Sequence, residues 1–88
     1  MDRPFKPIVF SDHSQTQMKE RGATQKEVIE AIKYGEEISA KHKRQAYRKN
    51  FQFDSKWGNK SYRIKQVMPI TAEEENQIVV ITVYAFYF

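Results

Sequence analysis

The sequence contains no cysteine, three glycines and three prolines, and it has no glycine-rich run. Without cysteine the chain can form neither a disulfide nor a thiolate zinc site. Without a glycine-rich run it lacks a phosphate loop of the kind that nucleotide-binding proteins use. No apolar stretch is long enough to cross a bilayer, and the N-terminal residues lack the apolar core of a secretory signal. We therefore expect a cytoplasmic protein with no membrane partner.

The length of the chain favours a single domain. Its 88 residues are enough for one small domain with a modest core, which we place over residues 1–88. Apolar residues make up 40% of the chain and charged residues 30%, as is typical of a globular protein. No linker, internal repeat or low-complexity segment divides the sequence.

Positive charge is concentrated in the middle of the chain. Residues 41–65 contain nine lysines and arginines and one acidic residue, whereas residues 66–88 contain three glutamates and no basic residue. A local cationic stretch attracts polyanions and speeds their encounter with a protein. Because aromatic residues lie among these cations, we expect contact with nucleic acid. A solvated basic face is the simpler alternative.

Two helices are predicted in the first half of the chain. Ser11 is a favourable N-cap and Gly22 a favourable C-terminal residue, so the segment between them is predicted to be helical. Thr24, with a glutamate three residues later, begins a capping box, and apolar residues at helical spacing follow it. A second helix is therefore predicted over residues 24–34. The first helix has one large apolar residue, Met18, so it must dock partly through polar contacts or stay open for function.

The apolar period then changes from that of a helix to that of a strand. With a short strand before the first helix, four strands are predicted, over residues 5–10, 36–53, 61–70 and 78–88. A turn is expected over residues 54–60 and an acidic loop over residues 71–77. The last strand is apolar on both faces, which is typical of a central strand or of an edge that a partner covers. The order β-α-α-β-β-β predicts an α+β domain with two helices on one face of an antiparallel sheet.

Four side chains near the first helix are candidates for chemistry. At about 100° per residue, His13, Gln17 and Glu20 fall within a narrow arc. Arg21 lies slightly further round. Histidine titrates near neutral pH and can accept or donate a proton, whereas arginine can bind a phosphate through two parallel hydrogen bonds. A capping or surface histidine, and an arginine paired within its own helix, are the plainer alternatives.

Cations on the middle strands are candidates for phosphate binding. Alternation places Arg48 opposite in phase to the phenylalanines that follow it, so it is expected on the open face. Arg63 and Lys65 share a face, and we expect this pair on an open sheet surface, where it would stabilise charge on a phosphate. The other candidate substrate-binding residues of this region are Tyr47 and the loop residues Lys41, His42, Lys43 and Arg44.

The last strand adds Thr82 and Tyr84, which share one face. They would complete a site or stack a base, and packing in the core is the alternative for Tyr84. His13 and His42, with scattered glutamates, do not have the spacing of a metal site, and no nucleophile elbow is present. We therefore expect no metal and no cofactor.

The segment from Phe10 to Gly22 resembles a bacterial family of small domains of unknown function. The shared motifs are Ser-x-His near the start of a helix, which is Ser11 to His13 here, and Met-x-x-Arg-Gly, which is Met18 to Gly22. The resemblance covers residues 8–39 and 61–84. That family in turn resembles the RelE/ParE toxin superfamily and the wider barnase-like group of metal-independent ribonucleases. The predicted element order matches the RelE-like fold.

The resemblance implies the toxin of a type II toxin–antitoxin pair, with RNA as substrate and a cognate antitoxin as protein partner. The helix histidine of the family falls on His13, and its helix-ending arginine falls on Arg21. The terminal Thr-x-Tyr of the family falls on Thr82 and Tyr84. The chain departs from the family in having Ser14 where alanine is usual and in its aromatic tail, which consists of Phe86, Tyr87 and Phe88. That tail would serve a partner interface or a homodimer through the C-terminal strand.

The expected function is a metal-independent endoribonuclease of the mRNA interferase type. His13 would remove the proton of a 2′-OH, whose oxygen would attack the adjacent phosphate to give a cyclic phosphate and a 5′-OH. Glu20 would orient His13, and Arg48, Arg63 or Lys65 would stabilise the developing charge. Tyr84 would hold a base or donate a proton. The alternatives are a non-catalytic ParE-like toxin that binds a protein target, and a plain nucleic-acid-binding module.

Overall fold

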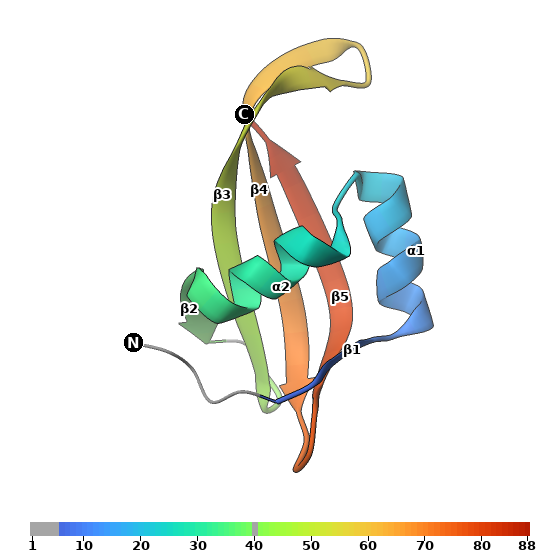
Figure 1. The fold of residues 1–88 in the computed structure, drawn as a ribbon, viewed down its shortest axis with the longest axis vertical. Coiled ribbons are helices and arrows are strands. Elements are labelled where there is room, and N and C mark those ends of the chain that lie inside the picture. Colours follow the sequence, from blue (N-terminus) through green and yellow to red (C-terminus); the bar gives the residue numbers. More distant parts are fainter. Residues whose placement is uncertain (1–5, 40) are drawn as a thin grey trace.

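The computed structural model of the chain describes residues 6–39 and 41–88. Its elements follow the order β-α-α-β-β-β-β (Figure 1). Their bounds are β1 Ile8–Phe10, α1 Asp12–Arg21, α2 Gln25–Tyr34, β2 Glu36–Ser39, β3 Arg44–Trp57, β4 Lys60–Glu73 and β5 Ile78–Tyr87. The described residues form an α+β fold of two helices and one five-stranded open sheet, as the class prediction required. Phe5, predicted to begin the first strand, lies outside the described residues.

The sheet is mixed, so the prediction of an antiparallel sheet is wrong. The strand order is β1-β5-β4-β3-β2, and β1 pairs with β5 in parallel, whereas the other neighbours are antiparallel. Ile8 is opposite Ile78 in this parallel pair. The two residues lie at opposite ends of the chain, and no local pattern indicates that their strands pair.

The segment 36–53, predicted as one strand, forms the hairpin of β2 and β3. The turn holds His42 and Lys43 at φ angles of 62° and 60°. Turns of this conformation usually contain glycine, asparagine or aspartate, none of which is present at these two positions. The turn was therefore missed. Strand β3 ends later and β4 begins earlier than predicted, so the expected turn over residues 54–60 is reduced to Gly58 and Asn59.

Both predicted helices are confirmed, and their caps are the expected ones. Ser11 Oγ accepts a hydrogen bond from the Ser14 N–H at 3.1 Å. In α2, the Glu27 N–H donates to Thr24 Oγ1 and the Thr24 N–H donates to the Glu27 carboxylate, at 3.1 and 3.0 Å. Figure 1 shows α2 crossing over the sheet, while α1 lies alongside β5. No helix in the described part of the chain is long and apolar enough to span a membrane.

The core lies between α2 and one face of the sheet, which we call the covered face. Its fully buried members include Val28 of α2, Val67 of β4, and Val80 and Val83 of β5. The opposite face of the sheet is covered by neither described helix, and we call it the open face. The pairing register assigns each strand residue to one face or the other, because directly opposed residues point to the same side.

The register places Lys65 on the covered face, opposite Tyr87, so the prediction that it lies on the open face is wrong. Ile64, Met68 and Ile70 occupy the open face of the same strand instead. An alternating strand with apolar residues on both faces does not reveal from polarity alone which face is buried. Lys65 was assigned to the open face because its charge outweighed the apolar residues beside it.

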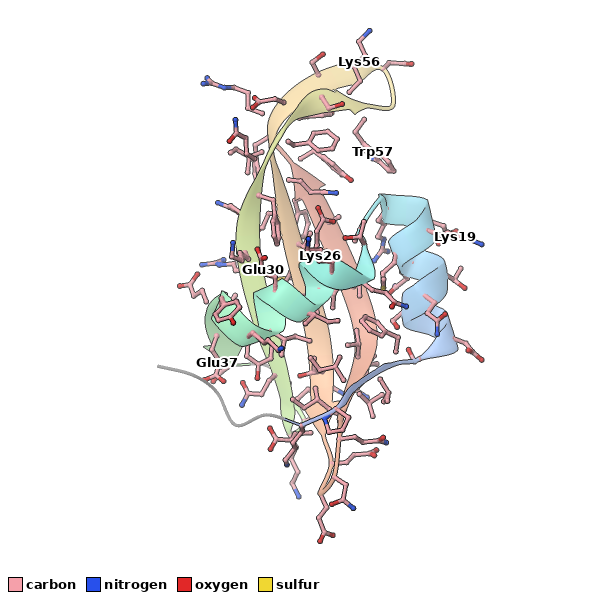
Figure 2. The ribbon with its side chains drawn as sticks, viewed as in Figure 1. Lys19, Lys26, Glu30, Glu37, Lys56 and Trp57 are labelled. Carbon is pink, nitrogen blue, oxygen red and sulfur yellow. The ribbon has the colours of Figure 1, made fainter. Side chains whose placement is uncertain are left out.

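The hairpin of β3 and β4 extends past the rest of the sheet and brings Trp57 against the end of α1. Figure 2 shows Trp57 pointing from the hairpin toward this helix end. The indole stacks on the ring of Tyr87, with centroids 5.1 Å apart and planes at 11°. A Cβ atom added at Gly22 would lie 2.6 Å from Trp57 Cζ3. Gly22 is therefore required both by its positive φ and by the ring beside it.

We predict that Gly22→Ala lowers the free energy of unfolding more than Gly58→Ala does. Both glycines have positive φ, at 77° and 63°, so each alanine costs about 1–2 kcal/mol in backbone conformation. At Gly22 the new methyl also meets the indole, which adds about 1–3 kcal/mol, whereas nothing lies within 4 Å at Gly58. Urea unfolding measures the difference, and a Trp57→Ala background should reduce it without abolishing it, because the Tyr87 hydroxyl also lies 2.7 Å from the added Cβ atom. Equal losses in the two variants would contradict the contact.

Candidate nucleic-acid interface

Helix α1 takes the place of a strand along the outer edge of β5. Strand β1 pairs with β5 only as far as Val80. Beyond it, Gln17 Oε1 accepts a hydrogen bond from the Val83 N–H at 2.9 Å, and Arg21 Nη1 donates to the Val83 carbonyl at 2.7 Å. Ser11 Oγ donates to the carbonyl of Ile81 at 3.3 Å. The helix with one large apolar residue is thus docked through polar side chains.

The sheet also holds the end of α1 by its backbone. The hydroxyl of Tyr87 donates to the Arg21 carbonyl at 2.6 Å, and Lys65 Nζ donates to the Gly22 carbonyl at 2.9 Å. Met18 is buried, and its carbonyl accepts the N–H of Gly22. Each specified position of the Met-x-x-Arg-Gly motif therefore has a docking role, whatever further role Arg21 has.

Lys65, a predicted catalytic residue, belongs to a buried ion pair. Its Nζ lies 2.9 Å from Glu27 Oε2, and the two side chains are 9% and 19% exposed. Phe53 closes the other side, with Lys65 Nζ 5.4 Å from its ring centroid. The ammonium group thus ties α2 to the covered face, and it is separated from the open face by the sheet.

One row of side chains crosses the open face from β2 to α1. Arg48 is opposite Glu36, and Arg48 Nε donates to Glu36 Oε1 at 2.6 Å. The register of β3 with β4 places Arg48 beside Met68, which is opposite Tyr84 on β5. The guanidinium of Arg21 lies over the Tyr84 ring, with Cζ 5.1 Å from the centroid. Arg48 is therefore on the open face as predicted, and the row has a guanidinium near each end.

The predicted shared face of Thr82 and Tyr84 is confirmed, and it is the open face. Thr82 is opposite Ile70, and Tyr84 is opposite Met68. Phe86 follows on the same face, and its ring is nearly parallel to that of Tyr84, with centroids 6.2 Å apart. The two residues are 38% and 42% exposed. Exposed rings in a row on an uncovered sheet are surfaces on which bases of single-stranded RNA stack.

His13 lies on the flank of α1 that faces away from α2. The opposite flank carries Lys19, which lines a hollow that also includes Gln25, the first residue of α2. At about 100° per residue, His13 and Glu20 lie on the other side of the buried stripe of the helix, toward the open face. The side chain of His13 is exposed and makes no hydrogen bond or ion pair with another described residue. Its imidazole is thus free to meet a ligand at the rim of the open face.

Glu20 does not contact His13. The two residues are two helical turns apart, which separates them by about 10 Å along the axis. Both are exposed. His13 and Glu20 lie on the same side of the helix, as their spacing predicted. No contact supports the prediction that the carboxylate of Glu20 orients the imidazole. Gln17, from the same arc, is buried against the backbone of β5.

The remaining candidates are spread over other parts of the molecule. Tyr47 is buried on the covered face, so its prediction as a substrate contact is wrong, because neighbours on a strand face opposite sides and Arg48 takes the open one. Lys41, His42 and Lys43 are exposed in the turn between β2 and β3, on the side of the sheet far from α1. Arg44 is opposite Ala72 on the open face. Arg63 is exposed beside a shallow hollow at the base of the β3–β4 hairpin.

Three open-face residues were missed in the sequence. Phe86 was interpreted as part of a partner-binding tail, although it follows Tyr84 by two positions and therefore shares its face. Asn50 follows Arg48 by two positions in the same way, and Gln66 is opposite both Asn50 and Phe86. Strand alternation is enough to place these three residues on the open face once one residue of each strand is known to lie there. In residues 6–39 and 41–88, no group of three or more histidine, aspartate or glutamate side chains is placed to hold a metal ion.

The chain matches the family described as "Domain of unknown function (DUF4258)" over residues 10–85, and it belongs to that family. This confirms the predicted resemblance to a family of small domains of unknown function. The match includes α1 and β5 through Ala85, and therefore the Arg21–Tyr84 contact. No curated protein and no solved structure matches the chain significantly.

We predict that Lys65→Met lowers the free energy of unfolding by about 3–5 kcal/mol, because Glu27 keeps a largely buried negative charge with no cation beside it. A Lys65→Met, Glu27→Gln double variant should recover part of this loss. The matched control is Lys49→Met, which removes a pair with Glu30 whose side chains are 31% and 39% exposed and should cost less than about 1 kcal/mol. Urea titration measures all three variants, and similar losses for the two single variants would refute a structural role of Lys65.

Because of the Tyr87 hydroxyl, the stability of the fold should decrease at alkaline pH. Burial raises the pKa of Tyr87 above its ordinary value of 10.0, and the negative charge of Glu27 acts in the same direction. The protonated hydroxyl donates to the Arg21 carbonyl, so its contribution is complete below pH 10 and is lost as the pH rises through the raised pKa. The difference in melting temperature between wild type and Tyr87→Phe should therefore shrink above about pH 10. Tyr34→Phe, at an exposed tyrosine, serves as the control, and a constant difference for Tyr87→Phe would contradict the linkage.

Proposed function

We propose that the chain is a metal-independent endoribonuclease toxin that binds RNA across the open face of its sheet. The observation that carries the proposal is the contact of the Arg21 guanidinium with the Tyr84 ring, at the rim where α1 presents His13. The contact joins a phosphate-binding group to a ring that can stack a base. The proposal includes a RelE-like relationship of the family, a cytoplasmic location and a cognate antitoxin as partner.

The sugar–phosphate backbone would follow α1, with the bases directed inward over β5 and β4. The hydrogen bond to Val83 occupies one of the five N–H donors of Arg21, so donors remain for a phosphate. Phe86, which is 42% exposed, would receive one base, and a second base would stack on the part of the Tyr84 ring that Arg21 leaves uncovered. Arg48 offers a second cation in the same row, partly neutralised by its ion pair with Glu36.

The proposed reaction starts with proton transfer from a 2′-OH to the imidazole of His13. The resulting oxygen attacks the adjacent phosphorus, the bond from phosphorus to the 5′-oxygen breaks, and that oxygen takes a proton from water. The products are a 2′,3′-cyclic phosphate and a 5′-OH. Arg21 would stabilise the negative charge that develops on the phosphate oxygens. A positioned general base of this kind contributes about 10²–10⁴-fold to the rate.

A second candidate function is a ParE-like toxin that docks on a protein target. It is favoured by the apolar part of the open face near β1, where Val79 is opposite both Val9 and Ala72 and no described helix lies over them. An uncovered apolar surface of this kind is typical of a protein-binding site. The same fold would then inhibit a target without cleaving RNA.

The test is incubation of purified protein with RNA in excess chelator, followed by mapping of the new ends. We expect cleavage that leaves cyclic phosphates and 5′-hydroxyls, slowed about 10²–10⁴-fold by His13→Ala. Lys19→Ala, an exposed change on the opposite flank of α1, is the control and should cleave like wild type. Cleavage that needs a divalent metal, or that His13→Ala leaves unchanged, would refute the mechanism. Growth arrest with intact RNA, retained in His13→Ala, would favour the docking function.

A further inference from the structure

The row of the open face next to the Arg21–Tyr84 contact combines an aromatic ring with two carboxamides. Gln66 lies between Phe86 of β5 and Asn50 of β3, and it is directly opposite each of them. Gln66 Nε2 donates a hydrogen bond to Asn50 Oδ1 at 2.9 Å. We propose that this row is a nucleobase subsite, in which Phe86 stacks a base and the Asn50–Gln66 pair binds its edge. This inference rests on the proposed function, because it requires single-stranded RNA on the open face.

The carboxamide pair has hydrogen-bonding capacity that the protein leaves unused. A carboxamide has an NH₂ group with two donors and an oxygen acceptor. In the bond between the two side chains, Gln66 uses its nitrogen and Asn50 uses its oxygen. Asn50 Nδ2 and Gln66 Oε1 then bind no other described residue through a side-chain hydrogen bond. The pair therefore presents a donor and an acceptor side by side, each held in place by the mutual bond.

A donor beside an acceptor matches the edge of adenine. Adenine offers the N6 amino group as donor and a ring nitrogen as acceptor, and asparagine and glutamine are its usual partners. Guanine presents two acceptors on its N7 edge, which suits arginine instead. A base that presents its N7 edge to the pair is therefore expected to be adenine rather than guanine.

The distances along the row suit a base that spans two strands. Directly opposed residues of neighbouring strands have Cβ atoms about 4.5–5.5 Å apart. A base stacked on Phe86, with its sugar toward α1, would extend its edge over β4 and reach Gln66. The preceding nucleotide would stack on Tyr84, whose ring is tilted only 13° from that of Phe86. The backbone then passes Arg21, where the proposed function places a phosphate.

Gln52 offers a matched control on the same face. It is one row further along β3, opposite Ile64 rather than next to an aromatic ring. Its Nε2 donates to Asp54 Oδ2 at 2.6 Å, so its amide is engaged within its own strand. Gln52→Met and Gln66→Met therefore remove the same group from the same face, and only the second removes it from the subsite.

The test measures binding of four fluorescent 2′-O-methyl hexanucleotides, each made of a single base, by anisotropy with the full chain. These probes lack the 2′-OH nucleophile, so they measure binding without cleavage. We expect wild type to prefer the adenine probe over the guanine probe by about 5- to 150-fold, the discrimination of one bidentate contact. Gln66→Met and Asn50→Ala should reduce this preference to less than about 2-fold, with the affinity for the guanine probe nearly unchanged. Gln52→Met should keep the wild-type preference.

Phe86→Leu provides the second arm, because loss of stacking should weaken binding of all four probes by about 5- to 150-fold. A preference for another base, or an adenine preference that persists in Gln66→Met, would overturn the subsite while RNA binding stands. Failure of wild type to bind any probe would overturn the proposed function and the subsite together. Weaker binding in Gln52→Met than in Gln66→Met would place base recognition elsewhere on the face.

Discussion

The backbone N–H and C=O of Val83 are both hydrogen-bonded by side chains of α1, and the arrangement of the molecule depends on this contact. The oxygen of Gln17 and the guanidinium of Arg21 bind Val83 as a neighbouring strand would. They protect an edge of β5 that the three residues of β1 do not reach. Unpaired strand edges invite pairing with other chains, so this contact also blocks one such edge.

The docking of α1 decides what lies on the open face. A helix with a continuous apolar stripe, such as α2, packs over the covered face and buries its inner side. Because α1 is attached through polar groups at the edge of the sheet, its flank with His13 stays at the rim and Arg21 can reach Tyr84. Tyr87, Lys65 and the hairpin that carries Trp57 then hold the end of the helix in place. Arg21 contributes both to this docking and to the proposed binding of phosphate.

Local signals were enough to predict the helices, because their caps are satisfied within three residues of each helix start. The parallel pairing of β1, the turn at His42 and the face of Lys65 could not be predicted in the same way. Each depends on partners distant in the sequence or on a turn without the usual residues. Lys65 in particular is buried because Glu27 of α2 lies beside it, and strand alternation does not contain that information.

The residues of the candidate site also differ in how well the sequence alone predicted them. Arg21, Thr82 and Tyr84 were identified from motifs, and the structure brings them together at one rim of the sheet. Residues chosen for charge or phase alone had mixed outcomes: Arg48 lies on the open face, whereas Lys65 and Tyr47 are buried on the covered one. The carboxamides of Asn50 and Gln66 carry no charge and belong to no motif. They stand out only when the register aligns the strands.

The most direct measurement is a set of intermolecular NOEs between a short uncleavable RNA and the protein. RNA on the open face predicts NOEs from base protons to the rings of Tyr84 and Phe86 and to the methyl group of Met68. NOEs confined to Tyr34 and the rest of α2, with none to the open face, would contradict the central claim.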